Sequence, residues 1–115
     1  MDTVNLLLQY LKNKRVINDI NKAMAETATA QVTLKKEDDL FIRDAITGLG
    51  IILKEDLEHH YYITTVKTGT FNNVLSYAII QRNGSKASIA VYAHEGIVKQ
   101  KLVQKTIGRL SEMLC

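Results

Sequence analysis

The sequence predicts an α+β fold with two or three N-terminal helices, a three-stranded antiparallel β-meander and a C-terminal helix packed on the sheet. Apolar residues early in the chain recur at helical spacing, whereas the period changes to two from about residue 59. Further on, Asn83-Gly84 separates two apolar runs, as in a hairpin. The 115 residues are therefore interpreted as a single domain (1–115), with a helical part at about 1–50 and the meander plus last helix at about 59–115.

The helical part begins with two apolar stripes. Asp2 is a suitable N-cap for a first helix over about 3–13, because its carboxylate can accept hydrogen bonds from the first turn. A second helical pattern starts at Ile17 and reaches Ala28. The threonine-rich segment 27–34 alternates near its end, so helix tail, loop and short strand all remain open for it.

A third helix is predicted in the run KKEDDLFIRDAITGLG. The acidic side chains of Glu37, Asp38 and Asp39 fall in its first turn, where the helix dipole favours negative charge. Gly48 and Gly50 follow the apolar stripe and are typical of the end of a helix.

Three antiparallel strands are expected next. β-branched and aromatic residues alternate from about residue 59 to Lys67, which favours a strand. The later runs VLSYAIIQ and ASIAVYA are predicted to pair as a hairpin, because Asn-Gly readily takes the positive φ angles of a type I′ turn. Consecutive antiparallel strands joined in this way form a meander.

The hairpin turn predicts which side chains share a face of the sheet. A two-residue Asn83-Gly84 loop pairs Ile80 with Ala87 and places Tyr77 and Tyr92 on the opposite face. Both faces are largely apolar, which is typical of strands covered on both sides. We therefore expect the C-terminal helix on one face, and either the N-terminal helices or a second copy of the chain on the other.

The last helix is predicted over about 96–113, where apolar residues form a wide stripe. Lys101, Lys105 and Arg109 recur every four residues at the edge of this stripe. Such a basic line can follow a phosphate backbone, so these residues are the candidate nucleic-acid contacts. The competing interpretation is the solvated flank of an amphipathic helix.

The net charge of +3 is unevenly distributed along the chain. Residues 1–36 hold six basic and three acidic side chains, and residues 59–115 hold seven basic and two acidic ones. Between them, residues 37–58 hold two basic and seven acidic side chains. An acidic block between basic ones indicates a site for a basic partner surface, self-association through complementary patches, or simply solvated faces.

Catalytic and metal-binding patterns are weak in this sequence. His59 and His60 are adjacent, so on a strand they point to opposite faces and cannot hold one ion together. His94 lacks the second histidine of a metalloprotease helix, and no phosphate loop or nucleophile elbow is present. We expect no metal site and no cofactor, and favour a protein that is not an enzyme. A small hydrolase or nuclease using one of these histidines remains an alternative.

Residues 3–65 resemble a winged helix in the order of their predicted elements, with three helices followed by a small hairpin wing. The resemblance covers about half of the chain and implies nucleic-acid binding. Its recognition helix carries Asp38, Asp39 and Asp44 against Arg43 alone, and phosphate would repel that charge. A winged-helix shape with such an acidic helix favours binding to another protein.

The candidate protein-binding residues are therefore Asp38, Asp39 and Asp44 on the acidic helix, together with Tyr77 and Tyr92 on one sheet face. The two tyrosines have a competing interpretation as core residues, and a third one as a stacking platform for bases.

We expect a small, non-catalytic binding or regulatory module that acts through protein–protein contacts as a homodimer. The alternative from another class is a winged-helix-like nucleic-acid-binding regulator. No run is apolar enough to span a membrane, and the start of the chain lacks the pattern of a secretory signal, so a cytoplasmic location is expected. Cys115 alone excludes an internal disulfide.

Overall fold

The computed structural model describes residues 2–67, 75–93 and 101–115, and they form an α+β fold, as predicted. The strands make one antiparallel sheet with the order β1-β5-β4-β3-β2, so that β1 and β2 are its edges. The elements are α1 (Thr3–Asn13), α2 (Ile20–Met24), β1 (Thr27–Thr33), α3 (Asp39–Thr47), β2 (Ile52–Asp56), β3 (Tyr61–Lys67), β4 (Leu75–Asn83), β5 (Lys86–Tyr92) and α4 (Lys101–Leu114).

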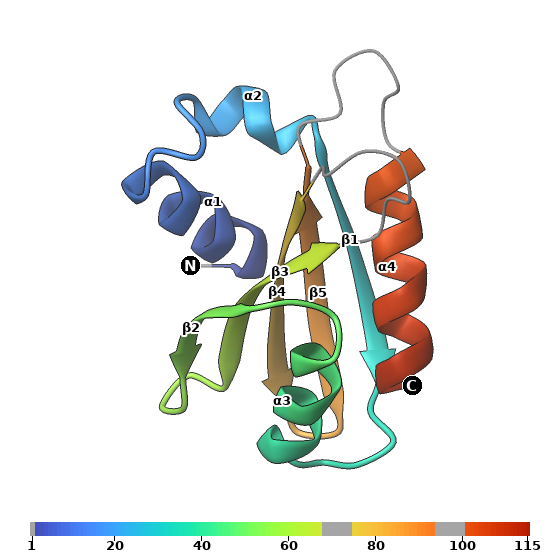
Figure 1. Cartoon of the computed structure of the whole chain (residues 1–115). Coiled ribbons are helices and arrows are strands. Elements are labelled where there is room, and N and C mark those ends of the chain that lie inside the picture. Colours follow the sequence, from blue (N-terminus) through green and yellow to red (C-terminus); the bar gives the residue numbers. More distant parts are fainter. Residues whose placement is uncertain (1, 68–74, 94–100) are drawn as a thin grey trace.

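The sheet lies between two layers of helices (Figure 1). α1 begins at the predicted N-cap, where Asp2 accepts a hydrogen bond of 2.9 Å from the backbone N–H of Asn5. The apolar stripe of α1 is buried together with α2 against one face of β3, β4 and β5, with Leu7, Leu8 and Leu11 fully buried.

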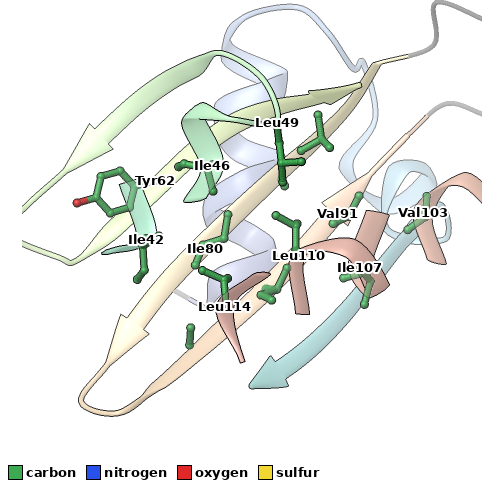
Figure 2. Close-up of a cluster of buried hydrophobic side chains, with 14 of the residues drawn as sticks. Ile42, Ile46, Leu49, Tyr62, Ile80, Val91, Val103, Ile107, Leu110 and Leu114 are labelled. Carbon is green, nitrogen blue, oxygen red and sulfur yellow. The ribbon is translucent and has the colours of Figure 1, made fainter. Parts of the chain in front are cut away.

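The opposite face of the sheet carries α3 and α4 (Figure 2). Ile42 and Ile46 of α3 and Leu110 and Leu114 of α4 are all fully buried there. They pack in one cluster with small aliphatic side chains of β4 and β5. For the face opposite α4 the sequence left open N-terminal helices or a second copy of the chain, and α1 and α2 lie there. The third predicted N-terminal helix, α3, lies instead on the face of α4.

The sheet has five strands where a meander of three was predicted. The segment that the sequence left open is β1, and its alternating side chains place Ala28, Ala30 and Val32 on the face of α4. β2 lies outside the predicted meander, although the winged-helix resemblance included a small hairpin in this part of the chain. Its pairing with β3 shifts register between Ile52 and Lys54.

The registers of the predicted strands also need correction. β3 begins at Tyr61, because the preceding His60 has φ of 57° and belongs to the turn after β2. The β4–β5 loop is Gly84-Ser85, and only Gly84 has positive φ (63°), as in a type II′ turn. This loop pairs Ile80 with Ile89, two positions from the predicted partner. A shift of two keeps every side chain on its predicted face.

The winged-helix resemblance does not extend to the structure. β1 separates α2 from α3, and the two helices belong to opposite layers of the sheet. A helix-turn-helix needs its helices packed against each other, so α3 is not a recognition helix of that kind. The part of the last helix predicted at 96–100 lies outside the described residues.

Candidate protein-binding surfaces

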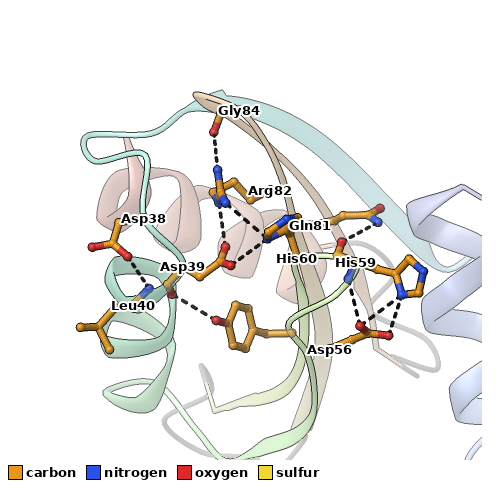
Figure 3. A network of polar contacts seen from close by, with 10 residues as sticks. Asp38, Asp39, Leu40, Asp56, His59, His60, Gln81, Arg82 and Gly84 are labelled. Carbon is orange, nitrogen blue, oxygen red and sulfur yellow. Dashed lines mark hydrogen bonds and ion pairs between the residues drawn. The ribbon is translucent and has the colours of Figure 1, made fainter.

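A polar network joins the start of α3 to β3 and β4 (Figure 3). The Arg82 Nε donates a hydrogen bond of 2.7 Å to Asp39 Oδ1, and His60 Nδ1 lies 2.8 Å from Asp39 Oδ2. The Tyr62 hydroxyl donates to the backbone carbonyl of Asp39 at 3.3 Å. Arg82 also donates to the carbonyl of Gly84 at 3.2 Å, which ties the hairpin turn to the same group.

Asp39 and Arg82 hold each other in the ionised state. Burial alone would raise the pKa of Asp39, but the hydrogen bonds of Arg82 and His60 outweigh it and hold the pKa below 3.8. The hydrogen bond to Asp39 in turn raises the pKa of Arg82. Burial, followed by the charge of Asp39, raises the pKa of the Tyr62 hydroxyl to about 12. The network therefore fastens α3 to the sheet.

The three acidic candidates of α3 have different environments. Asp38 caps the helix, since its carboxylate accepts a 2.9 Å hydrogen bond from the N–H of Leu40. The side chain of Asp39 is only 22% exposed and is engaged by Arg82. Asp44 is exposed. Asp38 and Asp44 thus remain available to a partner, whereas a partner of Asp39 would have to break its contacts within the chain.

Tyr77 and Tyr92 are cross-strand neighbours on the face covered by α1 and α2. Tyr92 is 5% exposed, and Tyr77 is partly buried against the same cluster. Burial raises the pKa of Tyr92. A stacking platform needs open ring faces, so the pair is best described as core.

The candidate basic line on α4 is only partly described. Lys105 and Arg109 are exposed one turn apart, whereas the side chain of Lys101 lies outside the described residues.

The histidines considered for catalysis have separate carboxylate partners. The ring Nδ1 of His59 lies 3.1 Å from Asp56 in the β2–β3 turn, whereas His60 contacts Asp39. His94 lies outside the described residues. Within residues 2–67, 75–93 and 101–115, no group of three histidine, cysteine or acidic side chains is placed to hold a metal ion.

The two edges of the sheet differ in a way that sequence reasoning missed. β2 carries Lys54, Glu55 and Asp56, and its ladder is interrupted by the register shift, two devices that discourage pairing with another strand. β1 has the sequence TATAQVT, without charge or proline, and all seven residues pair regularly with β5. The alternation of threonine and alanine was the signal that could have identified this edge.

The outward face of β1 is also left uncovered by α1. A hollow of about 460 Å³ lies between the start of α1 and the polar side of β1 and β5. Its lining residues are Asp2, Thr3, Val4, Thr29, Ala30, Gln31, Ser88 and Ile89. Thr29 and Gln31 are exposed there, so this side of the edge strand is accessible to another chain.

No helix in the described parts of the chain is long and apolar enough to cross a bilayer. The sequence matches no protein-family model, and a search of curated proteins finds no similar one.

Proposed function

We propose that this protein is a small, non-catalytic binding module that acts through protein–protein contacts as a homodimer, with β1 as the contacting element. The observation that supports this is the edge of β1, which is uncharged, regularly paired with β5, exposed on its polar face and paired on its other side with no strand of residues 2–67, 75–93 and 101–115.

An edge strand presents a row of unpaired backbone N–H and C=O groups that another strand can satisfy. Each hydrogen bond formed in this way contributes roughly 0.5–1.5 kcal/mol in water. Seven regular residues in β1 offer several such bonds without repulsion between charged side chains. The charged and irregular β2 edge of the same sheet offers far less.

Two features of the sequence predicted a dimer, namely a sheet that is apolar on both faces and the complementary charge blocks. The first of them gives no support, because α1 and α2 already cover the face opposite α4. Backbone pairing at the edge of the sheet now supports association in place of apolar burial on its face.

The test is the molar mass of the purified protein in solution, measured by light scattering and sedimentation equilibrium across the micromolar range. A dimer is expected, with a monomer appearing on dilution. A monomeric mass at the highest concentration would refute the homodimer.

Hydrogen exchange gives a second, local readout. The β1 amides that point away from β5 should become protected as the concentration rises, because pairing removes them from water. The turn after β2, around His59, serves as the internal control, and its exchange should not depend on concentration.

A further inference from the structure

We infer that two copies of this chain pair through β1 in one antiparallel register centred on Ala30, with their α4 helices side by side on one face of a continuous sheet. This arrangement depends on the proposed homodimer and specifies its contact surface.

The register follows from symmetry and from the length of β1. Two identical antiparallel strands in one sheet are related by a two-fold axis perpendicular to the sheet. The two residues of each cross-strand pair have their side chains on the same face. An axis at Ala30 pairs all seven residues of β1 with residues of the partner's β1. An axis at Thr29 or Gln31 shifts the two strands along each other, so that residues at the strand ends have no partner. In this register Thr29 lies opposite the partner's Gln31.

The chemistry of both faces suits this register. On the polar face the pairs join threonine and glutamine side chains, which can hydrogen-bond across the strands. On the other face Ala28 meets the partner's Val32, which continues the apolar surface beneath α4. The Ala30-centred pairs include no two like charges.

The orientation of α4 turns one flank toward the free edge of β1. Thr106 Oγ1 lies 3.2 Å from Ser76 Oγ of the central strand β4, so this side of α4 faces the middle of the sheet. Gly108 lies about 200° further round the helix, since successive residues turn by about 100°. The opposite flank therefore carries Gln104, Gly108 and Ser111.

This flank has room for a second helix. α4 packs over β1 and also over β5, which places its axis inside the edge of the sheet. With strands about 4.8 Å apart, two such helices related across the β1 edge lie roughly 10 Å apart. Packed helices have axes about 8–10 Å apart. A Cβ built on Gly108 meets no atom within 4 Å, so this position leaves space for a neighbour.

The decisive variants place charge on the polar face of the proposed contact. Thr29→Lys combined with Gln31→Lys sets lysine opposite lysine twice, and should weaken the dimer about tenfold or more. Thr29→Glu combined with Gln31→Glu should do the same. Mixing the two proteins should restore a heterodimer, because lysine then faces glutamate. Both positions are exposed in the monomer, so each variant should keep its circular dichroism spectrum.

The matched control adds two positive charges elsewhere, with Gln9→Lys and Asn13→Lys on the exposed side of α1, and should leave the dimer unchanged. If the lysine variant stays dimeric, or if mixing does not restore association, the β1 arrangement is wrong while the homodimer stands. If the unsubstituted protein is monomeric, the homodimer itself fails.

Discussion

Replacing Gly50 by alanine is expected to destabilise the protein strongly. A Cβ on Gly50 would lie 1.8 Å from the backbone oxygen of Thr65, an overlap that forces the chain to move. Thr65 cannot yield easily, because its N–H donates to the carbonyl of Ile51 at 2.9 Å and its hydroxyl accepts from the N–H of Ile51 at 3.0 Å. Gly50 thus marks a close approach between two segments.

The size of the effect follows from these contacts. Overpacking in a fixed site costs about 1–3 kcal/mol, and each of the two hydrogen bonds at risk is worth about 1 kcal/mol. We therefore expect Gly50→Ala to lose about 3 kcal/mol of unfolding free energy. For a domain of this size that lowers the melting temperature by roughly 15 °C.

The matched control is Gly48→Ala. A Cβ on Gly48 would meet only the carbonyl of Ala45 at an ordinary 3.6 Å, and the residue already has a helical φ of −76°. This variant should be neutral or more stable by roughly 0.5 kcal/mol, because alanine reduces the freedom of the unfolded chain.

Both variants and the parent protein are compared by urea and thermal unfolding at one protein concentration, followed by circular dichroism. If Gly50→Ala proves as stable as Gly48→Ala, the close approach between Gly50 and Thr65 is not a feature of the folded protein.

Three further predictions concern the network, the core and the basic line. Asp39 has a pKa depressed below 3.8 in the folded state, so its stabilisation is present above that pH and is lost as the pH falls through the folded value. Asp39→Asn should lower the free energy of unfolding by about 2 kcal/mol at neutral pH. The loss of stability on acidification, measured by urea unfolding at a series of pH values, should be smaller in this variant. An unchanged loss would contradict the stabilising role of Asp39. Leu110→Ala should cost about 2–5 kcal/mol in chemical unfolding, because this fully buried side chain leaves a cavity, and a loss under 1 kcal/mol would count against the packing. Fluorescence anisotropy at low salt should show no oligonucleotide binding; salt-sensitive binding weakened by Lys105→Gln with Arg109→Gln would instead support the nucleic-acid alternative.

The sequence predicts local features of the chain because the interactions that form them join residues only a few positions apart. Asp2 caps α1 and the helix occupies 3–13, as its polar cap and apolar stripe predict. The two faces of the hairpin were assigned correctly although its register was off by two positions, because the parity of a strand depends only on alternation. The α+β class follows from the same periodicities.

The edges of the sheet and the network around Asp39 were decided only by tertiary structure. Gly84 can take positive φ at either central position of a two-residue turn. Its place at the first position therefore depends on the pairing of Ile80 with Ile89 and on the contacts of Arg82 with α3. Asp39 lies 21 positions from His60 and 43 from Arg82, and no local pattern relates them. Residues 27–33 form a strand because they pair regularly with β5 along their whole length. The sequence by itself determined the first helix, the strand parity and the charge blocks. The second helix, predicted to reach Ala28, ends at Met24 and is followed by β1, and long-range packing determined which strand would be left open.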